Sequence, residues 1–300
     1  MLAHGIEAIR EHLAGLPAFD TIEIPERRKR FDAAEQVFKL PEGLAVNKIE
    51  CGGRPAELLT PAGEVERALL YLHGGGYVIG SPQSHRHLAA AIANTAGAVA
   101  LAPDYRLAPE HAFPCALVDA VAAYSWLQEN GWRPEQITIA GDSAGGGLAL
   151  ATLLHLKAEG MALPGAAVCI SPWTDLTASG ASHQSRADVD PMVTATNLRE
   201  YAEVYRGDRA LDDPLVSPLF GDLAGLPPLL IQVGDDEMLL DDARELHARA
   251  EAVGTDSKLE VWDGMVHVWH WFGEYLDEAA AATGNIARFM RVRCPAPGAA

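Results

Sequence analysis

Residues 136–160 read QITIAGDSAGGGLALATLLHLKAEG and carry the strongest structural signal in the sequence. This stretch begins as a β-rich run and continues from Ala144 as an alanine- and leucine-rich helical run. Between the two lies Gly141-Asp142-Ser143-Ala144-Gly145, which has the form G-x-S-x-G. A serine in this pattern, after a strand and before a helix, indicates a nucleophile elbow. Such a turn strains the serine backbone and crowds its neighbours, and glycine at 141 and 145 relieves the clash. The strand–helix context favours the elbow over an ordinary glycine-rich turn with a capping Ser or Asp.

Outward from this stretch, short β-rich runs alternate with helical runs. We expect strands at 68–73, 98–105, 136–141, 166–171, 229–234 and 259–264, and helices at 84–96, 115–129 and 144–160. Apolar strands separated by crossover helices indicate a mainly parallel sheet covered on both faces. The predicted fold class is therefore α/β.

Two segments depart from this alternation. Residues 1–45 are rich in charge and helix formers, and 25–40 place Phe31, Ala34 and Val37 at the spacing of an amphipathic helix. Residues 173–208 form a long, polar, partly helical excursion between two strands. Long excursions inside compact domains commonly act as lids or covers, and we expect that here.

Composition excludes several function classes. The chain has 23 Lys+Arg against 41 Asp+Glu, a net charge of −18, which opposes binding to nucleic acid or anionic lipid. The N-terminus lacks the pattern of a secretory signal, and no apolar run is long enough for a membrane helix. The four cysteines are scattered, without a CxxC pair. These features predict a cytoplasmic protein.

A second glycine-rich motif, His73-Gly74-Gly75-Gly76, follows the expected strand 68–73. Three consecutive glycines are costly to order, so they indicate a place where backbone N–H groups must approach a ligand atom closely. Together with the N–H of Ala144 they can donate to a developing oxyanion. The alternative, a phosphate-binding loop, lacks the following Lys-Ser/Thr and the GxGxxG spacing.

A serine nucleophile needs a base whose pKa is near neutral, which favours a histidine. Of the eleven histidines, His267 and His270 follow the expected strand 259–264. Their spacing also allows a metal pair, but no third ligand lies nearby. An orienting carboxylate is expected from the acidic run after 229–234, where Asp235, Asp236 and Asp241 are all available. A solvated loop or a calcium site is the alternative, although the spacing is not that of an EF-hand.

Five blocks together resemble the hormone-sensitive-lipase family of bacterial carboxylesterases, in its GDSAG-type branch. They occur in that family's order, and the resemblance covers about residues 70–270. The blocks are HGGGYVIGS (73–81), DYRLAPEHAFP (104–114), GDSAGGGLA (141–149), DDPLVSPLF (212–220) and GMVH (264–267).

The resemblance implies an α/β-hydrolase fold and hydrolysis of short- to medium-chain acyl esters through an acyl-enzyme, without a cofactor or metal. It assigns Ser143 as nucleophile, His267 as general base and Asp236 as the carboxylate that orients His267. The oxyanion-hole amides would be those of Gly75, Gly76 and Ala144. The block around Asp104, Tyr105 and Arg106 would hold the oxyanion loop.

The same resemblance divides the chain into a helical cap, a catalytic domain and a tail. The expected cap is 1–45 with 173–208, the catalytic domain is 46–172 with 209–293, and the tail is 294–300. Aromatic side chains near these segments are candidate pocket walls, with ordinary core packing as the alternative: Tyr77, Trp173, Tyr201, Tyr205 and Trp269.

The predicted partner is a small-molecule ester, not nucleic acid or a membrane, and we leave a homodimer open. Within the enzymes, an amidase or a longer-chain lipase could use the same groups. From another class, a ligand-binding receptor on this fold would be expected to have lost a member of the triad. Here Ser, Asp and His are all present, which favours the enzyme.

Overall fold

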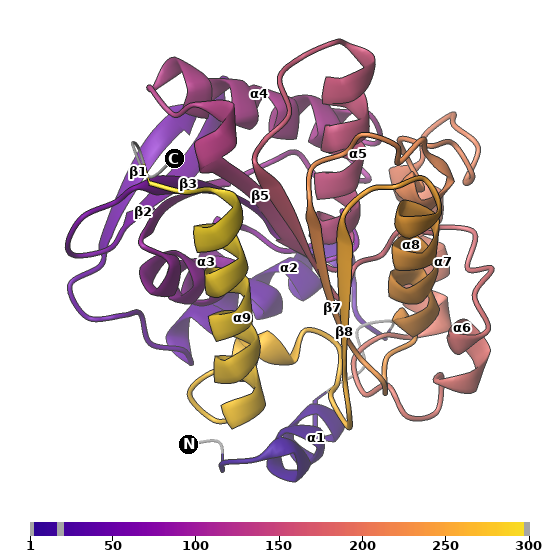
Figure 1. Ribbon diagram of the computed structural model, residues 1–300. Helices are drawn as coiled ribbons and strands as arrows, with labels where there is room; N and C mark the ends of the chain where they lie inside the picture. The colour runs from indigo at the N-terminus through magenta and orange to yellow at the C-terminus, as the bar shows by residue number, and fades with distance from the viewer. Residues whose placement is uncertain (1–2, 17–20, 297–300) are drawn as a thin grey trace.

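A single eight-stranded sheet runs through the molecule in the order β1-β2-β4-β3-β5-β6-β7-β8. Figure 1 shows it in a computed structural model that describes residues 3–16 and 21–296. The strands are β1 (Ala45–Cys51), β2 (Arg54–Thr60), β3 (Arg67–Leu72), β4 (Ala98–Pro103), β5 (Ile137–Asp142), β6 (Ala166–Ile170), β7 (Leu229–Gly234) and β8 (Ser257–Trp262).

Every pairing from β4 to β8 is parallel, which confirms the predicted mainly parallel sheet. In register, Leu70 of β3 lies opposite Leu101 of β4 and Ile139 of β5. The antiparallel strands β1 and β2, which the sequence analysis missed, form one edge. β1 contains Lys48 and Glu50 and is largely solvent-exposed, so it lacks the apolar run by which the other strands were found.

Helices cover both faces of the sheet. The helices are α1 (Ile6–Ala14), α2 (Ile24–Asp32), α3 (Pro82–Ala96), α4 (Cys115–Glu129), α5 (Ala144–Ala158), α6 (Ser182–Ser185), α7 (Ala195–Tyr205), α8 (Leu240–Ala252) and α9 (Asp277–Arg293). α3 and α9 pack with one face of the sheet, and α4, α5 and α8 pack with the other. This is the α/β-hydrolase arrangement expected of the fold class.

The amphipathic helix expected over 25–40 is wrong in its second half. α2 ends at Asp32, a short 3₁₀ turn follows over Ala33–Gln36, and Val37 is 55% exposed. Both apolar and charged side chains hold α2 in place: Ile24 and Phe31 pack against the core, and two arginines reach neighbouring segments. The buried Arg27 donates to Glu200 of α7 at 2.7 Å, and Arg28 donates to the carbonyl of Val78 at 2.8 Å.

The last helix that the structure describes is α9, which ends at Arg293, one residue before the expected tail 294–300. Residues 297–300 of that predicted tail lie outside the described residues. Within residues 3–16 and 21–296, no helix combines the length and the apolar composition needed to span a bilayer.

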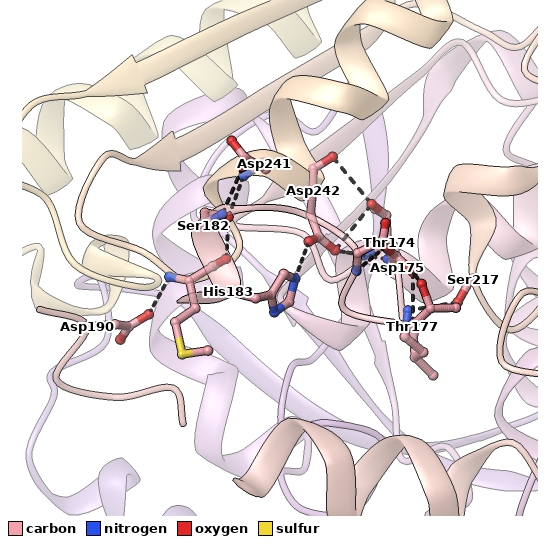
Figure 2. Close-up of polar contacts among 12 residues, drawn as sticks. Thr174, Asp175, Thr177, Ser182, His183, Asp190, Ser217, Asp241 and Asp242 are labelled. Carbon is pink, nitrogen blue, oxygen red and sulfur yellow. Dashed lines mark hydrogen bonds and ion pairs between the residues drawn. The ribbon is translucent and has the colours of Figure 1, made fainter. Parts of the chain in front are cut away.

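A polar network fastens the excursion between β6 and β7 to the start of α8 (Figure 2). Its centre is a buried pair in which His183 Nε2 lies 2.9 Å from Asp242 Oδ1. The other oxygen of Asp242 accepts the amides of Thr174 and Asp175. Ser182 donates its hydroxyl to the carbonyl of Met238 at 2.7 Å. Because α8 follows β7 directly, the excursion is tied to the loop at the end of that strand.

Asp242→Asn should destabilise the protein strongly, because it leaves His183 without its charged partner in the interior. Breaking a buried pair in this way costs about 3–5 kcal/mol. Urea unfolding followed by circular dichroism measures the loss. Asp222→Asn, which removes an exposed pair with Lys157, is the control and should leave the unfolding midpoint nearly unchanged. Equal midpoints for the two variants would show that the buried pair does not hold the excursion.

Candidate active site

Ser143 lies at the turn between β5 and α5, and its backbone has φ 54° and ψ −122°. A non-glycine residue at positive φ is strained, as a nucleophile elbow requires. Glycine is needed on both sides because a Cβ on Gly145 would overlap the carbonyl of Leu72, and a Cβ on Gly141 would overlap the backbone of Gly145. The predicted elbow geometry is therefore present.

The glycine loop after β3 lies beside this serine, and Gly75 and Gly76 line the same cavity as Ser143. Their φ values are 113° and 62°, which favour glycine. A Cβ on Gly75 would overlap the carbonyl of Ile79, and one on Gly76 would overlap the ring of Tyr201. Within the described part of the chain, the N–H groups of Gly75, Gly76 and Ala144 find no acceptor. These three donors are thus available to a bound oxygen.

A buried polar cluster supports the loop from below. Asp142 Oδ1 accepts the hydroxyl of Tyr71 at 2.7 Å and the amide of Gly74 at 3.2 Å. His85 Nε2 lies 3.3 Å from the other oxygen of Asp142. Burial alone would raise the pKa of Asp142, but His85 and the Tyr71 hydrogen bond outweigh it and hold the pKa below its ordinary value. Asp142 is therefore an anchored carboxylate that fixes Gly74.

Tyr105 holds the loop from another side, which agrees with the role implied by the resemblance for its sequence block. Its hydroxyl donates to the carbonyl of His73 at 2.7 Å, and its ring stacks on the His73 ring at 4.1 Å between centroids. Burial lowers the pKa of His73 to about 3, so this histidine is neutral and structural. Arg106 lies outside the loop and pairs with Asp119.

His267 follows β8 and lines the cavity together with Ser143. Its Nδ1 lies 2.8 Å from Oε2 of Glu237, a side chain with no exposed surface. The other oxygen of Glu237 accepts the Ser171 hydroxyl at 2.7 Å and the Gly234 amide at 2.6 Å. The Ser171 oxygen in turn accepts the amide of Val268. Every oxygen of the buried carboxylate is thus hydrogen-bonded.

The electrostatics of this pair follow from burial. Burial is the largest influence on His267 and would lower its pKa, but the hydrogen bond to Glu237 and the charge of that carboxylate outweigh it, so the pKa is raised. Burial also raises the pKa of Glu237, against the influence of His267 and Ser171. An imidazole held in one orientation, with a raised pKa, is suited to accept a proton.

The structure does not bring Asp236 to His267, and in this the sequence prediction is displaced by one residue. Asp236 forms an ion pair with Arg10 of α1. Asp235 accepts the amide of Gly264 at 2.7 Å, and Asp241 accepts the amide of Ser182. In the turn that leaves β7, residue 237 is the one that points inward, and the longer glutamate side chain reaches the imidazole.

A sequence signal for Glu237 did exist. It directly precedes Met238, Leu239 and Leu240, all of which are buried. This position favours burial of Glu237, but it does not single out Glu237, because Asp241 follows the same run and is only half-buried.

The cavity that joins these groups has a volume of about 100 Å³. Its walls are mostly apolar and come from both predicted cap segments as well as the sheet domain: Phe31, Ile79, Trp173, Met192, Val193, Leu198, Tyr201, Val268 and Trp271. Of the five aromatic candidates, Trp173 and Tyr201 line the cavity. Tyr77 and Tyr205 stack on each other in the core, 3.6 Å between centroids, and Trp269 is buried elsewhere.

His267 and His270, whose spacing in the sequence also allowed a metal pair, do not share a site. His270 Nε2 lies 2.8 Å from Gln232 Oε1, whereas His267 contacts Glu237. The chemistry of the cavity is therefore that of a serine hydroxyl, an imidazole–carboxylate pair and a set of free backbone N–H groups.

Comparison with known proteins agrees with this geometry. Residues 69–271 match the α/β hydrolase fold family. An acetyl-hydrolase of Streptomyces hygroscopicus is 48% identical over 90% of each chain. An esterase of Acinetobacter venetianus is 32% identical over 87% of each chain.

Solved structures agree as well. The esterase EstE5 superposes with a TM-score of 0.92 at 42% identity, covering 97% of this chain and 99% of its own. An esterase from the bacterial hormone-sensitive lipase family superposes with a TM-score of 0.91 at 44% identity, covering 96% of both chains. The chain therefore belongs to the hormone-sensitive-lipase family of α/β-hydrolases, and it is a carboxylesterase of the serine-hydrolase class.

Proposed function

We propose that the protein hydrolyses esters of short- to medium-chain acids through an acyl-enzyme formed on Ser143. The observation that carries this proposal is the cavity shared by Ser143 and His267, with Glu237 bound to the far side of the imidazole. In this mechanism His267 takes the serine proton as Ser143 Oγ attacks the ester carbonyl carbon. Gly75, Gly76 and Ala144 donate their N–H groups to the oxyanion.

Collapse of the tetrahedral intermediate expels the alcohol, which takes the proton from His267. Water then enters, loses a proton to His267 and attacks the acyl carbonyl, which releases the acid and restores Ser143. Glu237 does not react. It holds the Nδ1 proton of His267, so that Nε2 stays free as the base, and it stabilises the imidazolium. No cofactor takes part in any of these steps.

The size of the cavity supports the preference for short chains, since about 100 Å³ leaves little room for a long one. Relatives whose names specify a substrate point the same way: an acetyl-hydrolase, an acetyl esterase of Salmonella typhi and an ethyl acetate hydrolase of Pseudomonas putida. We propose that 1–45 and 173–208 act as the cap. The contact between Arg27 and Glu200 joins the two segments, which supports one common roof.

The cytoplasm stays the predicted compartment, and the four cysteines, none in a disulfide, are compatible with it. A homodimer stays a prediction.

Ser143 should be the one residue that a fluorophosphonate probe labels, because among the serines that the structure describes it is the one that lines a cavity with His267 and the glycine loop. Peptide mapping by mass spectrometry identifies the labelled residue. Ser143→Ala should abolish both labelling and hydrolysis of p-nitrophenyl butyrate while the unfolding midpoint stays the same. Labelling at another residue, or full activity in Ser143→Ala, would refute the assignment.

Glu237→Gln should lower kcat by about 10⁴, because the amide can no longer hold the correct tautomer of His267, as in the serine-protease precedent. Asp236→Asn is the matched control: it removes one carboxylate charge from the next residue and should cost less than about tenfold. Both are measured by steady-state kinetics on p-nitrophenyl butyrate. A crippled Asp236→Asn beside an active Glu237→Gln would restore the original sequence prediction.

The kcat/KM should rise with pH through the pKa of His267, since only neutral imidazole accepts the serine proton. Glu237 raises this pKa, so the midpoint should lie above the ordinary histidine value of about 6.5. In Glu237→Gln the residual activity should show a midpoint at lower pH. A profile that is flat between pH 5 and 8, or a midpoint that Glu237→Gln does not lower, would contradict this role.

A further inference from the structure

A second cavity lies behind the active-site cavity, between α3, α9 and residues 38–41. It has a volume of about 330 Å³, larger than the active-site cavity. We call it the rear cavity. Its lining includes Phe38, Leu40, His87, Leu88, Ala91 and His270.

Trp271 is the one residue in the described part of the chain that lines both cavities. It belongs to the short 3₁₀ turn Trp269–Phe272, four positions after His267. Toward the active site its ring lies 5.1 Å from the ring of Phe31, which lines the front cavity. Toward the rear it lies 5.4 Å from His87 and 6.3 Å from Phe38. The indole is thus the partition between the two spaces.

The side chain of Trp271 is held in place by packing against neighbouring rings and not by a hydrogen bond of its indole. The indole Nε1 of Trp271 is buried and has no hydrogen-bond partner among the residues described. Trp271 is 8% exposed, so the side chain is enclosed on nearly all sides. Removing the indole would therefore break no side-chain hydrogen bond, although it would also remove the edge contact with the His85 ring, 4.8 Å between centroids.

The chemistry of the rear cavity suits an uncharged chain. Its buried polar side chains are His87, His270 and Thr283, and burial lowers the pKa of both histidines to about 3, so both rings are neutral. His270 keeps its Nε2 on Gln232, and its Nδ1 lacks a hydrogen-bond partner within the described residues. Phe38, Leu40 and Leu88 supply apolar wall. Charged Lys39 and Glu274 also line the space, and both are largely solvent-accessible.

We propose that Trp271 determines the maximum chain length of the ester, because its indole closes the active-site cavity against a rear cavity that could hold the rest of the chain. This rests on the proposed function, and it assigns a specificity-determining role to a residue outside the catalytic groups. Each methylene moved from water into an apolar space gains about fourfold in binding. Two additional buried methylenes are therefore enough for a change of more than tenfold.

The test compares kcat/KM for a long and a short ester in the unmodified protein and in Trp271→Ala. Two series are measured, p-nitrophenyl esters from butyrate to decanoate and acetates of alcohols of the same lengths, because either arm of the ester could point toward Trp271. In one series, Trp271→Ala should raise the long-to-short ratio at least tenfold. Trp271→Leu removes less of the side chain and should raise the same long-to-short ratio by a smaller factor. If the alanine variant does not fold, the ratio in Trp271→Leu provides the test.

Two further variants make the result specific. In the double variant Trp271→Ala with Ala91→Phe, the new phenylalanine on α3 would fill part of the rear cavity. The long-to-short ratio of kcat/KM should then return to within threefold of its value in the unmodified protein. Leu198→Ala enlarges the front cavity without opening the rear one, and it should change the ratio less than Trp271→Ala does. Thermal unfolding of each variant confirms that it is folded.

A ratio that rises less than tenfold in both series, in a folded Trp271→Ala, would overturn the proposal. So would a rise that Ala91→Phe does not reverse. Failure of the proposed function looks different: Ser143→Ala would then be as active as the unmodified protein on every ester, whatever the chain length.

Discussion

The structure of the site depends on one buried hydrogen bond, between Nδ1 of His267 and the carboxylate of Glu237. A buried carboxylate is unfavourable unless each oxygen has a partner, and here Ser171 and Gly234 occupy the oxygen that His267 leaves free. Ser171 directly follows β6, Gly234 ends β7 and His267 follows β8. The pair can therefore exist only when the carboxyl ends of three neighbouring parallel strands are in register, which links the chemistry to the sheet.

The same region binds the excursion over residues 173–208, several of whose residues line the cavity. Asp190 accepts the amide of Met238, one residue after Glu237, and Ser182 donates to the carbonyl of that same Met238 (Figure 2). Asp190 also accepts the amides of Met192 and Val193, two residues of the cavity wall. The cavity wall at Met192 and Val193 is thus joined, through the turn after β7, to the carboxylate that bonds His267. A substitution that moves the cavity wall at Met192 and Val193 is therefore expected to move Glu237 as well, and the reverse.

Much of this could be predicted from the sequence, for reasons that differ between residues. The elbow was predictable because only glycine fits at positions 141 and 145, two residues before and after Ser143. The parallel sheet was predictable because its strands are continuous apolar runs. The orienting carboxylate was not, since Asp235, Asp236 and Glu237 are neighbours and only the path of the turn decides which points inward. β1 was missed because an exposed edge strand carries polar residues, and β2 was missed because Arg54 and Glu57 interrupt its apolar run. The position of Trp271 between two cavities depends on packing among α3, α9 and residues 31–41, which no local pattern encodes.

The central claim is that Glu237, rather than Asp236, holds the Nδ1 proton of His267. Proton NMR of protein labelled with ¹⁵N-histidine tests it most directly, because a proton in a short imidazole–carboxylate hydrogen bond resonates far downfield and correlates with its own nitrogen. The account predicts one such signal from His267 Nδ1 that persists in Asp236→Asn and disappears in Glu237→Gln. A signal lost in Asp236→Asn and kept in Glu237→Gln would contradict it.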